Sequence, residues 1–173
     1  SMLHPLTTLQ YHYISVYNTA FMSEGRDLFD HAWLSLHDVS FFSFTITACQ
    51  DAEIILAEFP GNPDARVYAI AIGSNGNTET KIGRDRISNG VTASTPNILS
   101  CNERKEFWIS WSYYSGLIEL GSGNTPGEYP ILHYKDTDDD PYMVRAVSFK
   151  TPTSTKGEWR FDSTSSKNCN VLN

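Results

Sequence analysis

The sequence lacks the features that mark membrane proteins, nucleic-acid-binding proteins and secreted precursors. No apolar run approaches the 18 or more residues of a membrane span, so we expect no membrane insertion. The 13 Lys and Arg residues are scattered singly among 20 Asp and Glu, for a formal charge of −7, which argues against nucleic acid as a partner. No charged segment leads into an apolar stretch at the N-terminus, so no signal peptide is expected, and Ser1-Met2 is typical of a cloning scar.

Cysteine is scarce, and its spacing excludes the common zinc and redox motifs. Cys49, Cys101 and Cys169 lie far apart, with no Cys-x-x-Cys pair. Two interpretations remain open: three reduced thiols in a cytoplasmic protein, or one disulfide between Cys49 and Cys101 in an extracellular one. Cys49 ends an apolar strand and Cys101 precedes another, so we expect adjacent sheets to bring them together.

Catalytic signatures are also absent. His31 and His37 lie six residues apart, which fits neither zinc-ligand spacing nor one helical face. There is no Gly-x-Ser-x-Gly motif. The glycine-rich segment 121–124 runs into the turn 125–127, and not into the helix that a phosphate-binding loop requires. The sequence therefore predicts no catalytic residue and no cofactor.

What the sequence has is aromatic and β-forming residues: aromatics make up 13% of the chain. Alternating apolar segments between turn signals predict about ten strands, at residues 11–17, 41–48, 54–59, 67–72, 80–84, 107–111, 117–120, 131–134, 143–149 and 159–161. Residues 25–36 allow at most a loose helical turn, and 85–97 read as a loop. This spacing predicts a single all-β domain over residues 1–173, a two-sheet antiparallel β-sandwich of jelly-roll, lectin-like type.

The strand 107–111 is the clearest of these segments. Phe107, Ile109 and Trp111 point to one face, which we expect to be core, and Trp108 points to the other. Trp108 is either a buried second layer or an exposed platform on which a ligand stacks. In the segment 41–48 the apolar side chains also share one face: Phe42, Phe44, Ile46 and Ala48.

Two polar segments are candidate binding sites. The turn at 73–80 gathers Asn75, Asn77 and Glu79, which suit hydrogen bonding to a polar ligand such as a sugar. The alternative is structural, with Asn75 and its neighbour supplying positive φ and Asn77 bonding its own backbone.

The second segment is the acidic run 135–141. Asp136, Asp138 and Asp140 alternate as calcium ligands do, but the run lacks the glycine turn and distal Glu of an EF-hand loop. A solvated turn ending at Pro141 is the other interpretation of this run.

Several motifs in order carry a family resemblance, from Phe44-x-Ile46-x-Ala48 to Gly157-x-Trp159. Between them lie Asp51-Ala52, Tyr68-x-Ile70-x-Ile72-Gly73, Asn75-Gly76-Asn77, Ile98-Leu99-Ser100, Phe107–Trp111 and Gly116-x-Ile118-x-x-Gly121. Over about residues 42–161 the chain resembles the farnesoic acid O-methyltransferase-like domain.

The resemblance implies two different roles. The family name implies methyl transfer to farnesoic acid, an isoprenoid acid, whereas related domains within larger extracellular proteins imply binding or adhesion. In relatives an Arg-rich stretch follows the polar turn, here thinned to Lys81 and Arg84. We expect a non-catalytic recognition module for carbohydrate or a protein partner, and the alternatives are the enzyme or a structural spacer. The candidate ligand residues are Asn75, Asn77, Glu79, Arg84 and Trp108.

Overall fold

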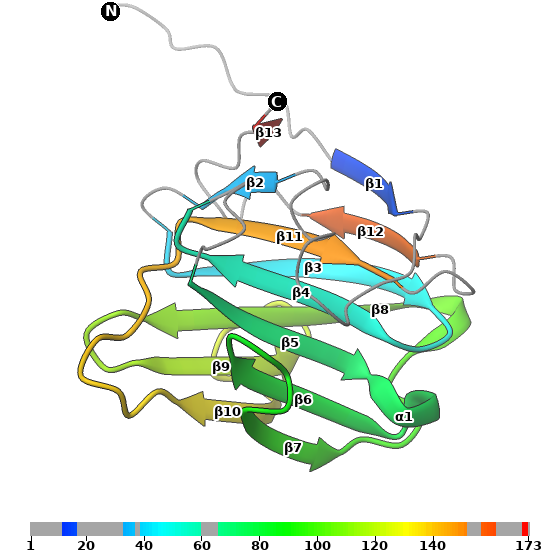
Figure 1. Ribbon diagram of the computed structural model, residues 1–173. Coiled ribbons are helices and arrows are strands. Elements are labelled where there is room, and N and C mark those ends of the chain that lie inside the picture. The colour runs from blue at the N-terminus through cyan, green and yellow to red at the C-terminus, as the bar shows by residue number, and fades with distance from the viewer. Residues whose placement is uncertain are drawn as a thin grey trace, which may run out of the picture.

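The alternating segments of the sequence form two antiparallel sheets that pack face to face (Figure 1). The computed structural model describes residues 12–16, 33–36, 39–59, 66–151, 157–161 and 171–172. Within them the six-stranded sheet has the order β1 (His12–Val16), β12 (Gly157–Phe161), β3 (Phe41–Ala48), β8 (Ser100–Ser112), β9 (Leu117–Ser122), β10 (Pro130–Lys135). The seven-stranded sheet has the order β13 (Val171–Leu172), β2 (Trp33–Ser35), β11 (Ala146–Lys150), β4 (Ala52–Ala57), β5 (Val67–Gly73), β6 (Glu79–Arg84), β7 (Gly90–Ser94).

The chain crosses repeatedly between the sheets, from β3 to β4, from β7 to β8 and from β10 to β11. Every strand pairing in both sheets is antiparallel. The predicted two-sheet antiparallel sandwich of jelly-roll type is therefore confirmed.

Three segments differ from the sequence prediction. β7 forms inside the segment 85–97 that was expected to be a loop, and its sparse apolar residues are only half-buried at a sheet edge. β8 begins at Ser100, ahead of its apolar part, because its polar half pairs with β3. Residues 33–35, expected within a helical turn, form β2 by pairing with β11, whereas residues 25–32 lie outside the described residues.

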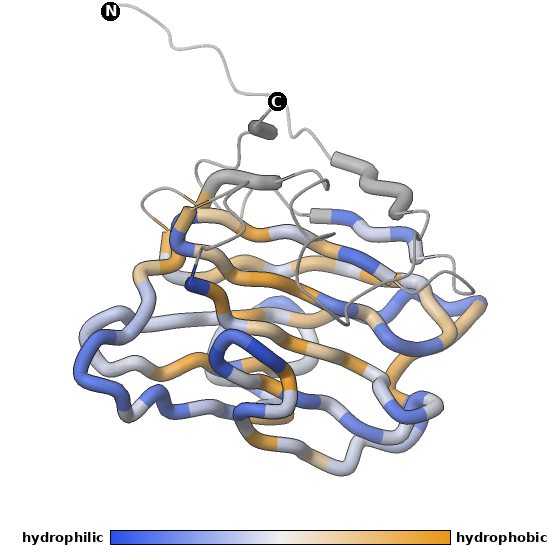
Figure 2. The backbone as a smooth tube through the Cα atoms, viewed as in Figure 1, coloured by the Kyte–Doolittle hydropathy of each residue, from blue (hydrophilic) through white to orange (hydrophobic). Residues whose placement is uncertain are grey.

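The core between the sheets is built on aromatic side chains, and the outcome for 41–48 matches the prediction. All four apolar residues on its predicted inner face are at most 2% exposed. Phe44 faces Phe107 on β8, with ring centroids 5.8 Å apart, and lies 5.7 Å from the Trp159 ring on β12. Hydrophobic segments run along the central strands, whereas the connections at the ends of the sheets are more hydrophilic (Figure 2). Such aromatic pairs add about 1 kcal/mol each beyond their area burial.

Trp108 lies on the opposite face of β8 and is fully buried there. It faces Gly121 on β9, where an added Cβ would sit 2.2 Å from the indole ring, so only glycine leaves room for it. The loop after β9 closes over the ring, and the indole Nε1 donates a 2.8 Å hydrogen bond to the Glu128 carbonyl. Trp108 is thus a second buried layer, and the expectation of an exposed ligand platform is wrong.

The only helix among the described residues is α1 (Ser74–Asn77), a single turn between β5 and β6. Asn75 and Gly76 there have φ of 53° and 70°, as the structural interpretation of this turn requires. No helix in the described ranges is both long and apolar enough to cross a membrane.

A disulfide joins Cys49 and Cys101, whose Cα atoms are 4.1 Å apart. Cys49 follows β3 and Cys101 lies in β8, and the residues before them, Ala48 and Ser100, are register partners. The bond therefore links neighbouring strands of one sheet, and not adjacent sheets as expected. It closes a chain segment with a sequence separation of 52, which includes β4 to β7.

Replacing Cys101 by serine should lower the free energy of unfolding by about 2–4 kcal/mol, because the cross-link restricts the unfolded chain. Chemical denaturation of Cys101→Ser and of the wild type, each with and without reductant, measures this loss. Reductant should bring the wild type to the level of the variant and add two reactive thiols in the denatured protein. An unchanged thiol number would contradict the disulfide.

Candidate functional site

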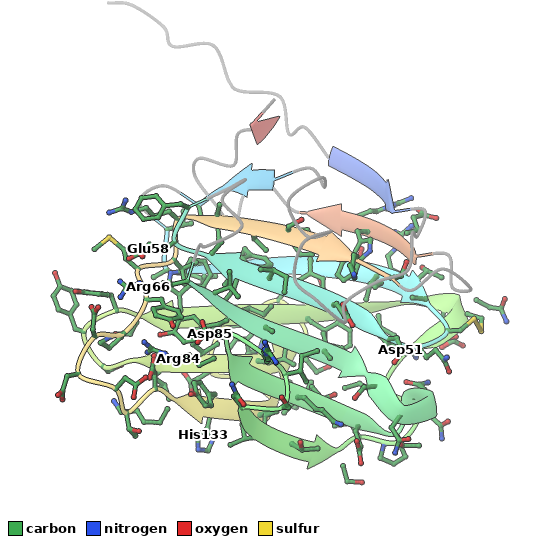
Figure 3. The ribbon with its side chains drawn as sticks, in the orientation of Figure 1. Asp51, Glu58, Arg66, Arg84, Asp85 and His133 are labelled. Carbon is green, nitrogen blue, oxygen red and sulfur yellow. A yellow bond between two sulfur atoms is a disulfide. The ribbon has the colours of Figure 1, made fainter. Side chains whose placement is uncertain are left out.

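The candidate ligand residues of the sequence do not form one site. Glu79 is the first residue of β6 and Arg84 is the last, so they lie about 17 Å apart along the strand. Figure 3 shows Arg84 with Glu58, Arg66 and Asp85 at one end of the sandwich, and Asp51 at the other.

At the end that holds the polar turn, Asn77 is used structurally. Its Nδ2 donates to the Leu99 carbonyl at 2.9 Å, and its Oδ1 accepts from the Leu99 N–H at 3.0 Å. This pair of bonds fastens α1 to the chain entering β8. Glu79 pairs with Lys81 at 3.0 Å, and Asn75 is exposed. The turn therefore has a structural role near the disulfide, and Asn75 is its exposed amide.

At the other end, the acidic run begins with a buried carboxylate. Asp136 is 3% exposed and accepts hydrogen bonds from the Tyr68 hydroxyl, at 2.6 Å, and from Arg84. The Tyr68 oxygen in turn accepts from the Tyr142 N–H at 2.8 Å. Burial and the bond to Asp136 raise the pKa of Tyr68, so its hydroxyl stays a donor. The Asp138 N–H also donates to the other carboxylate oxygen of Asp136 at 3.1 Å, so Asp136 is held by two neutral donors and one cation.

The other carboxylates of the run also face arginines. Asp138 pairs with Arg84 at 3.0 Å, and Asp140 pairs with Arg66. Arg66 also binds both oxygens of Glu58, at 2.8 and 2.9 Å, and lowers the pKa of that carboxyl. In the described part of the chain no three His, Cys, Asp or Glu residues are placed to hold a metal ion. The run is an ion-pair network, and the expectation of a solvated turn is wrong for its first carboxylate, Asp136, which is buried.

The two arginines also contact an aromatic ring. The Arg84 and Arg66 guanidinium carbons lie 3.8 and 4.7 Å from the centroid of the Tyr142 ring. The Tyr142 hydroxyl donates to Asp85 at 2.8 Å, and burial together with that bond raises the pKa of Tyr142 to about 12. The segment that joins β10 to β11 is therefore fixed by charge, stacking and hydrogen bonds.

The C-terminal part of that segment forms one wall of an open cleft of about 820 Å³, which we call the aromatic cleft. Its lining residues are Leu36, Val39, Ser40, Trp111, Ser112, Tyr113, Tyr114, Met143, Val144 and Arg145. Leu36, Trp111 and Val144 are buried, and form its apolar floor. The remaining lining comes from the segment before β3, the β8–β9 turn and the chain entering β11.

Exposed hydrophobic side chains gather at this cleft. Five large hydrophobic residues are exposed among the described residues, and three of them line the cleft: Tyr113, Tyr114 and Met143. A fourth, Phe59, lies beside it, with its ring centroid 5.2 Å from the guanidinium carbon of the lining residue Arg145. Tyr114 is 98% exposed, with its ring 5.8 Å from that of Tyr113. Clusters of exposed apolar surface mark interaction sites. The sequence held one signal for this site: two adjacent tyrosines in a hairpin turn, where small polar residues are usual.

The chemistry of the aromatic cleft suits binding. Aromatic rings, serine and tyrosine hydroxyls and one guanidinium line it. The described lining residues include no Asp, Glu, His or Cys, which are the groups that usually act as general base or activate a nucleophile. The cleft can stack against a ligand and hydrogen-bond to it.

One carboxyl with a strongly shifted pKa lies elsewhere, and sequence reasoning missed it. Glu53 on β4 faces Lys150 on β11, and burial raises the pKa of Glu53 to about 7, partly offset by Lys150. Among the described residues its Oε2 atom has no hydrogen-bond partner. It belongs to the middle of the seven-stranded sheet, and not to the aromatic cleft.

The fold defines a β-sandwich protein of the jelly-roll class, with the open aromatic cleft at one end. The family model described as farnesoic acid O-methyl transferase matches residues 8–165, and the chain belongs to that family. None of the curated proteins matches the sequence.

Solved structures with a similar fold include three carbohydrate-related proteins. The carbohydrate-binding module CBM66 from Bacillus subtilis is 12% identical, with 92% of each chain covered and a TM-score of 0.45. The apo Crh5 transglycosylase is 7% identical, with 88% of this chain and 83% of that chain covered and a TM-score of 0.43. Lectin I from Ulex europaeus, in complex with the methyl glycoside of α-L-fucose, is 12% identical, with 88% and 90% covered and a TM-score of 0.43. At these identities and scores the likeness does not bear on the ligand of this chain.

Replacing Asp136 by asparagine should lower the free energy of unfolding by about 3 kcal/mol or more, because the Arg84 guanidinium loses its buried counter-charge. Urea denaturation measures the effect. Asp139→Asn is the matched control, since Asp139 is exposed and has no ion pair among the described residues; its effect should stay within about 0.5 kcal/mol. Equal effects for the two variants would contradict a central role for Asp136.

Glu53 should make stability depend on pH. Its pKa is raised in the folded state, so its contribution is complete below the unfolded value near 4.5 and is lost as pH rises through about 7. Relative to Glu53→Gln, the wild type should therefore lose up to about 3 kcal/mol between pH 4 and 8. Denaturation of both proteins at several pH values measures this difference. Parallel pH profiles would show that the carboxyl titrates normally.

Proposed function

We propose that this protein is a non-catalytic recognition module that binds carbohydrate through the aromatic cleft. The observation that carries the proposal is that three of the five exposed large hydrophobic residues line one hollow, while a fourth, Phe59, contacts its lining residue Arg145. Aromatic faces stack on the apolar faces of sugar rings, and the hydroxyls of Ser40 and Ser112 lie within the same lining to accept or donate hydrogen bonds. A protein surface is the other ligand that exposed tyrosines suit.

The rigidity of two cleft walls supports this function. Asp136 accepts from Tyr68 and Arg84, which fixes the start of the segment that carries Met143. The Asp136 N–H also donates to the Gly116 carbonyl at 2.8 Å, and Lys135 donates to the Ser115 carbonyl. Gly116 has φ of 66°, and a Cβ there would lie 2.6 Å from the Asp136 carbonyl oxygen, so the turn that presents Tyr114 packs directly on Asp136. A preformed site loses less entropy when a ligand binds.

We also propose that the protein works outside the cell, as an independent domain or within a larger extracellular chain. The Cys49–Cys101 bond supports this location, because disulfides persist mainly in oxidising compartments. Sugars and protein surfaces displayed on cells are the ligands found there.

A second candidate function is binding or methylation of an isoprenoid acid, as the family name implies. The apolar lining residues Leu36, Val39 and Val144, with the Arg145 cation beside them, favour a ligand with an apolar body and an acidic group. Calorimetric titration with S-adenosylmethionine and with farnesoic acid separates the two candidates. Heat with both would support the enzyme, and heat with the acid alone would support a carrier.

Tyr114→Ala should weaken carbohydrate binding at least about tenfold, because it removes the most exposed ring of the cleft. A glycan array first identifies bound sugars, and calorimetry then compares affinities. Tyr129→Ala is the matched control: Tyr129 is 77% exposed but does not line the cleft, so its loss should change affinity less than twofold. Equal losses for both variants would place the ligand elsewhere. A blank array would leave a protein ligand or a structural spacer as the role.

A further inference from the structure

The aromatic cleft holds one charged side chain that forms no ion pair among the described residues. Arg145 is the one charged residue in the described lining. Glu58, whose pKa is lowered chiefly by its hydrogen bonds from Arg66 and also by the Arg145 charge, already binds the Nε and Nη2 atoms of Arg66 with both oxygens. No carboxylate of the described residues forms an ion pair with Arg145, whereas Arg66 and Arg84 each have two.

The backbone of Arg145 is fixed while its head group lacks a strong acceptor. The Arg145 N–H donates to the Ala57 carbonyl at 2.9 Å, and its carbonyl accepts from the Leu36 N–H at 2.8 Å. The guanidinium lies 5.2 Å from the centroid of the Phe59 ring, and its Nη2 contacts the Met143 sulfur at 3.2 Å. A guanidinium carries five N–H donors, and a thioether is a weak acceptor. Arg145 is therefore positioned by packing, with donors left for a ligand.

We propose that Arg145 selects a sugar that bears a carboxylate, of the uronic or sialic acid kind. This inference rests on the proposed carbohydrate function and names the ligand class for the same cleft. A guanidinium binds a carboxylate through two parallel, charge-assisted hydrogen bonds, a geometry that lysine does not reproduce. The sugar ring then lies against the exposed tyrosines while the carboxylate meets Arg145.

The overall charge of −7 does not oppose this binding at close range. In the described part of the chain, the acidic groups near the cleft wall include Glu58 and Asp140, paired with Arg66, and Asp136, paired with Arg84. More distant charges are screened over about 8 Å at physiological ionic strength. Binding of an acidic sugar should consequently weaken as salt rises, more than binding of its neutral counterpart.

The experiment compares ligands that differ only in charge. Calorimetry measures binding of oligosaccharides ending in glucuronic or sialic acid, of the same oligosaccharides with the carboxylate reduced to an alcohol, and of octanoate as an apolar acid. Wild type should bind the acidic sugars at least about tenfold more tightly than the reduced ones. Arg145→Gln should remove that preference, so that the variant binds acidic and reduced sugars with about equal affinity, and Arg145→Lys should restore only part of it.

Arg104→Gln is the matched control, because Arg104 is exposed at the far end of β8 and forms no ion pair among the described residues. It should keep the full preference for acidic sugars. Equal affinity for acidic and reduced sugars, or an unchanged preference in Arg145→Gln, would overturn the inference and leave the proposed carbohydrate function standing. If the protein bound octanoate tightly but did not bind the acidic sugars, Arg145 would instead be assigned to the recognition of an apolar acid, and the inference would be wrong. Binding of no sugar at all would overturn both proposals.

Discussion

The structure at the end of the sandwich that holds the aromatic cleft depends on one buried carboxylate. Asp136 follows β10 of the six-stranded sheet. Its carboxylate accepts hydrogen bonds from Tyr68 on β5 and Arg84 on β6, two strands of the seven-stranded sheet. A carboxylate without such partners is costly to bury, so the two sheets must keep these donors in place. The same residue holds the β8–β9 turn through its backbone N–H. Asp136 therefore connects the core, the ion-pair network and the walls of the aromatic cleft.

The strands were predictable because alternation is a local property. The burial of Phe42, Phe44, Phe107 and Ile109 follows from their positions along two strands. The hydrophobic pattern of the sequence does not predict β7, because an edge strand needs few apolar residues. The buried state of Trp108 was one of two open interpretations, and a glycine on the neighbouring strand decided it.

The candidate site was harder to predict, because its partners lie far apart in sequence. Arg84 and Asp136 are 52 residues apart, and Tyr68 and Asp136 are 68 apart, so nothing local indicated that the acidic run is neutralised by arginines. The sequence indicates Asn77 as a ligand residue because of its amide. In the structure that amide instead forms hydrogen bonds to the backbone of Leu99, 22 residues away. Composition pointed to polar residues, whereas the exposed surface that best suits a ligand consists of tyrosines in a turn.

The contact between Trp108 and Gly121 also constrains how this protein can change over evolutionary time. An indole at one position forbids any side chain at the other, so neither site can vary alone without a penalty from overpacking or from an unfilled cavity. Descendants of this chain are free to exchange the pair only together, with a smaller residue replacing tryptophan as a larger one replaces glycine. If the loop after β9 were lost or remodelled, the Trp108 indole would lose the Glu128 carbonyl that accepts its hydrogen bond and would become a new exposed aromatic surface.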